Sequence, residues 1–127
     1  MLTDPISAFL TSLRNIGRSR KNSFSFPSSK TVKAIAQILA DRQFIDRFEE
    51  IVDGHKKELT IHLKPGRDPL ELKRMSKPGQ RIYVGYKDLK RVRNGLGIAI
   101  LTTSKGLLTD AEVRKLKTGG EYICEVY

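Results

Sequence analysis

The stretch "TTSKG", from Thr102 to Gly106, places three hydroxyl groups, a lysine and a glycine directly after an apolar run. Short hydroxyl side chains donate hydrogen bonds to phosphate or sugar oxygens and accept them from base edges. Lys105 would add positive charge, and Gly106 would let the backbone come close to a ligand. Two interpretations stay open at this point. The stretch is either a polar loop into a helix that Thr109 already caps, or a loop that binds RNA.

No other motif in the sequence is typical of an enzyme or of a common nucleotide site. Neither G-x-x-x-x-G-K-[ST] nor G-x-G-x-x-G occurs. The Lys117-Thr118-Gly119 triplet matches a β-lactamase box but has no S-x-x-K partner, so the match is interpreted as chance. Glu49 and Glu50 are neighbours on an expected strand and would point to opposite faces, which is poor geometry for acid–base work. The sequence therefore predicts a protein that is not an enzyme.

The cysteine and the histidines predict no metal site and no other cofactor. Cys124 is the single cysteine, so the chain has no internal disulfide. Only His55 and His62 could join it, and their spacing does not match a zinc site. We interpret Cys124 as a packing residue of a strand, and the two histidines as ordinary turn and strand residues.

The charge of the chain favours a polyanionic partner. Lysine and arginine number 24 against 14 aspartate and glutamate, which gives a net charge of +10 and a pI near 9.9. Residues 14–33 hold six basic residues and no acidic one, and residues 73–93 hold eight basic residues and one acidic one. This concentration favours phosphate contact over simple solvation for a set of basic residues, namely Arg20, Lys21, Lys90, Arg91 and Arg93.

Other classes of partner fit the sequence less well. No helix-turn-helix or zinc-finger pattern appears, which disfavours a DNA-binding module. No apolar stretch approaches the roughly 18 residues of a membrane span. The chain opens with Asp4 and Pro5 rather than with a basic and then apolar signal, so we expect a cytoplasmic or organellar protein with no membrane partner.

The first half of the chain is predicted to form helix, strand, helix, strand, strand. The first helix begins at Pro5, with Thr3 or Asp4 as its cap, and its apolar stripe consists of Ile6, Phe9, Leu10, Leu13 and Ile16. A short strand at 23–27 turns Phe24 and Phe26 inward. Ser28 or Ser29 caps the second helix, whose stripe consists of Val32, Ile35, Ala36 and Leu39. Two strands at 45–52 and 58–64 join around Asp53-Gly54, a strong hairpin signal, either in a tight turn or in a turn that "HKK" lengthens.

The second half is predicted to be mainly β with one short helix. Strands are expected at 70–75 and 81–86 around a Pro78-Gly79 turn, at 97–101 and at the end of the chain. Thr109 and Glu112 form a capping box, Leu108 and Val113 a hydrophobic staple, and Gly119-Gly120 ends the helix. The run "PGRDP" at 65–69 marks a boundary. The fold class is therefore α+β, with an N-terminal subdomain at 1–65 and a C-terminal one at 70–127 that carries the TTSKG loop.

Four separate stretches resemble one known family. They are "DPISAFLTSLRN" at 4–15, "SKPGQRIY" at 76–83, "GLGIAILTTSKGLLTDAE" at 95–112 and "GGEYIC" at 119–124. In this order they resemble the eighth protein family of the bacterial-type small ribosomal subunit, over nearly the whole chain. The sequence departs from the family pattern at Lys90, where the family often has proline, and in the basic run "KLKTGG".

The resemblance implies a two-subdomain protein that binds the central domain of small-subunit ribosomal RNA directly, early in subunit assembly. It also implies other small-subunit ribosomal proteins as neighbours. The alternative is a translational repressor that binds a stem in a ribosomal-protein messenger RNA, as the family does in some bacteria. Matched to the family motifs, the expected RNA-binding residues are Arg14, Asn15, Ser29, Lys30, Thr103, Ser104, Lys105, Gly106, Gly119, Gly120 and Glu121. Thr102 joins them on the residue types of the TTSKG stretch alone. Tyr83 and Tyr86 would either stack on bases or belong to the core.

Overall fold

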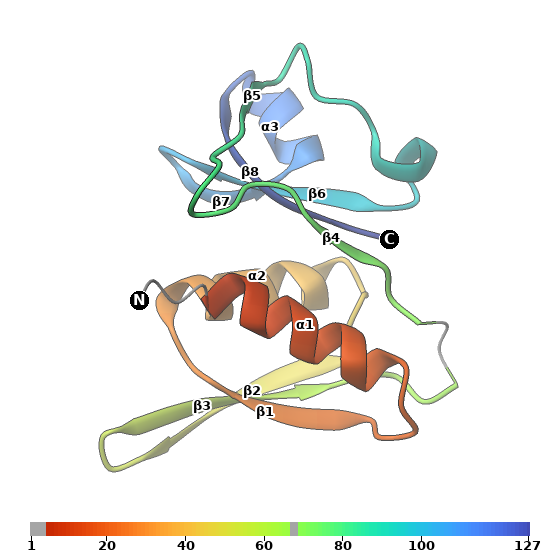
Figure 1. Cartoon of the computed structure of the whole chain (residues 1–127), viewed down its shortest axis with the longest axis vertical. Helices are drawn as coiled ribbons and strands as arrows, with labels where there is room; N and C mark the ends of the chain where they lie inside the picture. The colour runs from red at the N-terminus through yellow and green to blue at the C-terminus, as the bar shows by residue number, and fades with distance from the viewer. Residues whose placement is uncertain (1–4, 67–68) are drawn as a thin grey trace. The chain divides into compact units, whose positions relative to one another are not determined.

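The computed structural model describes residues 5–66 and 69–127, which contain three α-helices and two antiparallel sheets (Figure 1). The chain divides into two compact units, the first ending at Leu70 and the second running from Glu71 to Tyr127. Helices and antiparallel strands are present in both units, so the α+β class predicted from the sequence is confirmed.

Two sequence predictions fall on residues that are not described. The expected boundary "PGRDP" includes Arg67 and Asp68, and the expected caps of the first helix are Thr3 and Asp4. All four lie outside the described residues.

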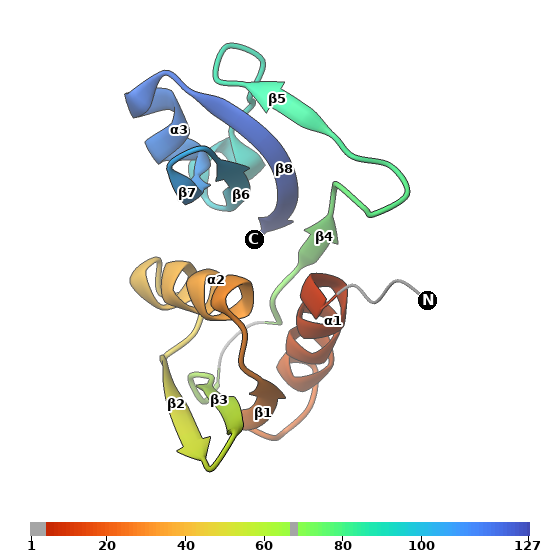
Figure 2. The ribbon, with the colours of Figure 1, turned by 90° about the vertical axis from the view of Figure 1, so that its left-hand side faces the viewer.

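In the first unit, two helices cover one face of a three-stranded sheet (Figure 2). The helices are α1 (Pro5–Gly17) and α2 (Lys30–Asp41). The strands are β1 (Ser23–Pro27), β2 (Arg47–Asp53) and β3 (Lys56–His62), in the order β1-β3-β2. The predicted succession of elements in this half of the chain is confirmed.

The apolar stripes of α1 and α2 form the core of the first unit, together with the inward side chains of the sheet. Every residue of the predicted α2 stripe is fully buried, and Phe9, Leu10 and Leu13 of α1 are buried with it. Phe24 and Phe26 point inward as expected, with ring centroids 6.1 Å and 5.3 Å from that of Phe9. Ser29 is the N-cap of α2, since its side chain accepts a hydrogen bond from the Val32 backbone N–H at 3.2 Å.

The turn between β2 and β3 is tight. Asp53 pairs with Lys56, so only Gly54 and His55 form the turn and the lysines of "HKK" belong to β3. Gly54 has φ of 61°, a conformation that glycine adopts without steric cost. The hairpin predicted near Asp53-Gly54 is therefore confirmed, and the alternative in which "HKK" lengthens the turn is not present.

The second unit contains a five-stranded sheet that is built around its last strand. Its strands are β4 (Leu72–Arg74), β5 (Tyr83–Gly85), β6 (Ile98–Thr103), β7 (Gly106–Thr109) and β8 (Gly119–Val126). They follow the order β4-β8-β6-β7, with β5 also paired to β8. A 3₁₀ turn (Val92–Gly95) precedes β6, and helix α3 (Asp110–Leu116) follows β7. The buried strand predicted at 97–101 and the last strand are confirmed.

The two strands predicted around Pro78-Gly79 are shorter than expected and do not pair with each other. Both β4 and β5 pair with β8 instead. The turn itself is present, because Lys77 and Gln80 exchange backbone hydrogen bonds of 3.0 Å and 2.9 Å.

Helix α3 begins as predicted and ends differently. The Thr109 side chain accepts from the Glu112 N–H, and Glu112 accepts from the Thr109 N–H, which completes the capping box. The helix ends at Leu116, and Lys117 takes the left-handed conformation with φ of 52°. The prediction that Gly119-Gly120 ends the helix was wrong, since both glycines lie in β8.

The core of the second unit is apolar. One cluster of this core consists of Leu89, Val92, Ala99, Leu101, Val113 and Tyr122. Tyr86 packs against this core, whereas Tyr83 is 70% exposed. Cys124 is fully buried and free, as expected for a packing residue, and burial raises the pKa of its thiol to about 12.

Candidate nucleic-acid interface

The TTSKG stretch is the tip of a β-hairpin. Thr102 and Thr103 end β6, Gly106 begins β7, and Ser104 and Lys105 form the turn between them. Gly106 has φ of 100°, which favours glycine over any residue with a side chain. The sequence did not predict β7, so the interpretation of a loop leading straight to the helix was incomplete.

The hydroxyls at this tip differ in what they contact. Thr103 Oγ1 donates to the Gly106 carbonyl at 2.9 Å and accepts from the Lys105 backbone N–H at 3.1 Å. The Thr103 hydroxyl therefore holds the turn itself and is not free for a ligand. Ser104 and Lys105 are exposed, and their side chains contact no partner among residues 5–66 and 69–127. These two side chains remain available for a ligand.

Gly119 and Gly120 allow β8 to approach its neighbours closely. A Cβ on Gly119 would lie 2.6 Å from the carbonyl oxygen of Val84 in β5. A Cβ on Gly120 would lie 2.0 Å from the carbonyl oxygen of Thr102 in β6. Both values are far below any real contact, so each position requires glycine for packing. The two glycines thereby help to set the position of the hairpin tip.

The carboxylate of Glu121 binds two residues of the segment between β4 and β5. It accepts hydrogen bonds from Ser76 Oγ at 2.5 Å and from Arg81 Nη1 at 2.9 Å. Ser76 is fully buried, and its hydroxyl also accepts from the Ile82 N–H at 3.1 Å. Burial on its own would raise the pKa of Glu121, but the hydrogen bonds from Ser76 and Arg81 outweigh it and lower this pKa.

Sequence reasoning did not identify Ser76 or Arg81 as residues that support the site. Both stand within the stretch "SKPGQRIY", which carried part of the family resemblance. Their position in this stretch was the one signal in the sequence that could have identified them as supporting residues. Each supports the site through Glu121, which pairs with Thr102 across β8 and β6.

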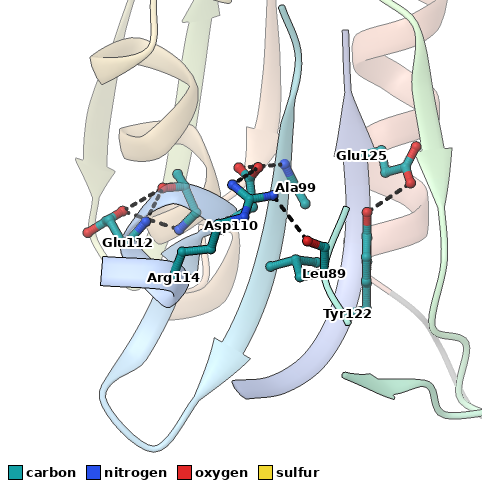
Figure 3. Close-up of polar contacts among 8 residues, drawn as sticks. Leu89, Ala99, Asp110, Glu112, Arg114, Tyr122 and Glu125 are labelled. Atoms are coloured by element: carbon teal, nitrogen blue, oxygen red, sulfur yellow. Dashed lines mark hydrogen bonds and ion pairs between the residues drawn. The ribbon is translucent and has the colours of Figure 1, made fainter. Parts of the chain in front are cut away.

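Helix α3 is fastened to the base of the hairpin by a buried aspartate (Figure 3). Asp110 Oδ1 accepts from the Ala99 N–H of β6 at 3.3 Å, and its Oδ2 accepts from Arg114 at 2.9 Å. Arg114 also donates to the Leu89 carbonyl at 3.4 Å. One carboxylate and one guanidinium thus connect β6, α3 and the segment that precedes the 3₁₀ turn.

The first unit carries the other predicted contacts in two places. Arg14 and Asn15 lie in the last turn of α1, whereas Ser29 and Lys30 lie at the start of α2. Strand β1 runs between these helix ends, and its five residues span about 16 Å. The structure therefore does not bring the two pairs together.

The start of α2 adjoins a pocket of about 370 Å³ with three lysines, Lys30, Lys33 and Lys57. The carboxylate of Glu50 lies in it and accepts from Ser28 Oγ at 2.7 Å and from Lys33 Nζ at 3.3 Å. These two contacts, that of Ser28 first, lower the pKa of Glu50. Lys30 and Lys57 have no ion-pair partner in the described part of the chain.

Two negative findings concern the described residues alone. No group of three or more His, Cys, Asp or Glu among them is placed to hold a metal ion. None of their helices combines the length and the apolar character that crossing a bilayer requires.

Comparison with known proteins gives the class and then the family. The small ribosomal subunit protein uS8 of Thermus thermophilus is 50% identical over 139 residues, with both chains fully covered. The proteins of the same name from Desulforudis audaxviator and Burkholderia mallei are 45% and 48% identical, with 98% or more of each chain covered. These relatives are ribosomal proteins of the small subunit. The family model described as ribosomal protein S8 matches residues 4–127, and the chain belongs to this family.

Proposed function

We infer that the chain is a structural constituent of the small ribosomal subunit that binds the central domain of small-subunit ribosomal RNA directly and supports subunit assembly. The observation that carries this inference is the hairpin tip, where Ser104 and Lys105 are exposed and unpartnered among the described residues. The net charge of +10 supports a polyanionic partner. No catalytic step and no cofactor enter this function.

The two tip residues have different roles in the proposed interface. Ser104 recognises RNA shape or a base edge through a hydrogen bond, and Lys105 contributes charge to the backbone contact. Thr102, Thr103 and Gly106 form the frame of the tip. Contacts of Arg14, Asn15, Ser29 and Lys30 with the RNA backbone would add affinity without sequence information.

The remaining predicted residues act in this proposal mainly through the protein. Gly119 and Gly120 allow the strands to approach, and Glu121 holds Ser76 and Arg81. All three residues help to position the hairpin tip in this proposal. A direct contact of any of them with RNA would add to this positioning role.

The proposal is tested by measuring the affinity of the full chain for a central-domain stem and for an unrelated duplex. Ser104→Ala should cost about 1–3 kcal/mol against the cognate stem and little against the duplex. Lys105→Ala should weaken both and reduce the salt slope by about one phosphate's worth. With about five phosphates neutralised, the log–log slope for the wild type should be roughly −3.5. Equal losses on both RNAs for Ser104→Ala would refute a recognition role for this residue.

The alternative role as a repressor would use the same surface on a stem in a ribosomal-protein messenger. Co-sedimentation separates the two roles, because a ribosomal constituent travels with small subunits and contacts neighbouring ribosomal proteins there. A chain that binds the messenger stem but stays out of small subunits would favour the repressor.

A further inference from the structure

A second cationic site lies in the unit Glu71–Tyr127, formed by residues other than those of the hairpin tip. It is a pocket of about 380 Å³, a volume in the range of small-molecule sites. Four cationic residues and two tyrosines contribute to its walls, namely Lys73, Lys90, Arg91, Arg93, Tyr122 and Tyr127. No family motif quoted for the resemblance contains its basic residues.

The cations of this pocket are only partly offset by the protein, because Asp88 and Glu125 are the two carboxylate side chains among its lining residues. Glu125 faces Lys73 across β8 and β4, but its carboxylate accepts a hydrogen bond from the Tyr122 hydroxyl at 2.8 Å (Figure 3). Within the described ranges, no carboxylate forms an ion pair with Lys73, Lys90 or Arg91. Asp88 also lines the pocket without pairing to them. An anionic ligand from outside would therefore meet a net positive charge.

The pocket also contains a cation–π pair. The guanidinium of Arg93 lies 4.2 Å from the centroid of the Tyr127 ring. Guanidinium and aromatic planes of this kind stack on unpaired bases of RNA. Positive charge alone would attract an acidic peptide as well as it attracts RNA. A cation that is stacked on an aromatic ring can in addition stack on a base, which favours RNA as the ligand.

The backbone is strained at Arg93, the residue whose guanidinium lies over the Tyr127 ring. Arg93 and Asn94 both take left-handed conformations, with φ of 49° and 56°, although neither is glycine. Backbone strain of this kind concentrates at functional sites. The 3₁₀ turn is held close to the end of β8 by Gly97, whose Cβ would lie 2.7 Å from the Val126 carbonyl oxygen and from Tyr127 Cβ.

We propose that this pocket binds one unpaired nucleotide of the RNA, with its phosphate held by Lys90 and Arg91 and its base stacked against the Arg93–Tyr127 pair. This proposal rests on the proposed function, which supplies the RNA. It adds a second contact of a different kind, because the hairpin tip offers hydrogen-bond donors and no stacking surface.

The test uses the full chain and two RNA stems, one with an unpaired nucleotide that carries 2-aminopurine and one fully paired. Arg91→Ala should weaken binding of the first stem about fivefold or more and change binding of the paired stem less. Arg93→Lys keeps the charge and removes the planar group, so it should lose affinity for the unpaired nucleotide with an unchanged salt slope. Stacking of the base should quench the fluorescence of 2-aminopurine when the wild-type protein binds, and the quenching should be smaller with Arg93→Lys.

The matched control is Lys115→Ala, since Lys115 is an exposed lysine of α3 without a partner in the described residues. Wild-type protein that binds neither stem would refute the proposed function itself. Wild-type protein that binds, with both pocket variants equal to Lys115→Ala, would refute only the nucleotide pocket. Equal losses on the two stems would also overturn it, as would competition by an acidic peptide as effective as the unpaired nucleotide.

Discussion

Replacing Gly120 by alanine tests whether this glycine is required for packing. The added Cβ would lie 2.0 Å from the carbonyl oxygen of Thr102 and 2.8 Å from its carbonyl carbon. An ordinary contact between carbon and a carbonyl oxygen is about 3.3 Å, so β8 and β6 would have to separate by about 1.3 Å. The obstructing atoms belong to the backbone, so a side-chain rotation cannot relieve the clash.

The expected cost follows from what this separation breaks. β6 and β8 pair from Ile98–Val126 to Thr102–Glu121, and the last pair of that ladder adjoins Gly120. Losing one or two ladder hydrogen bonds costs about 1 kcal/mol each, and overpacking adds roughly 1–3 kcal/mol. The free energy of unfolding should therefore fall by about 2–5 kcal/mol. At roughly 4 °C per kcal/mol, the melting temperature should fall by about 8–20 °C.

Thermal unfolding followed by circular dichroism measures this change, with Gly79→Ala as the matched control. Gly79 has no atom within 4 Å of its would-be Cβ and no positive φ, so alanine there should shift the free energy of unfolding by less than about 0.5 kcal/mol. If Gly120→Ala had the same melting temperature as Gly79→Ala, the steric argument would be refuted. Lost RNA affinity at an unchanged melting temperature would assign Gly120 to direct contact instead.

Three further predictions concern single residues of the same unit. Thr109→Ala removes the cap of α3 and should lower the free energy of unfolding by about 1 kcal/mol in urea titrations, while the folded protein keeps its RNA affinity. The pKa of Glu121 is lowered in the folded state, so its stabilising contribution is present above the unfolded pKa and is lost as the pH falls through the folded pKa; Glu121→Gln should flatten the acid limb of stability against pH. The Cys124 thiol, buried and with its pKa raised to about 12, should stay unreactive toward a disulfide reagent at pH 8 until the protein unfolds, and rapid labelling of native protein would contradict this burial.

The sequence was sufficient for elements whose signals are local. The stripes of α1 and α2 repeat with the helical period, the alternation around Phe24 marks β1, and the capping box at Thr109 marks the start of α3. In each case the interactions that form the element lie within a few residues. These elements were predicted with nearly the correct bounds.

The sequence was insufficient where distant segments decide the structure. The four-residue strand β7 has no alternation that separates it from a loop, and only its pairing with β6 defines it. Gly119-Gly120 resembles a helix stop, yet contacts with Val84 and Thr102 explain both glycines. Lys117 takes the left-handed position that glycine usually occupies, and nothing in its neighbours along the chain indicates this.

The same distinction bears on which predicted site residues can recognise RNA. A group that already holds a good hydrogen bond must give it up on binding, so its net gain is small, whereas an exposed group without a protein partner loses only its water. Thr103 and Glu121 hold such bonds within the protein. Ser104 and Lys105 hold none among residues 5–66 and 69–127. Recognition of RNA should therefore depend more on Ser104 and Lys105 than on Thr103, although all three residues belong to the TTSKG stretch.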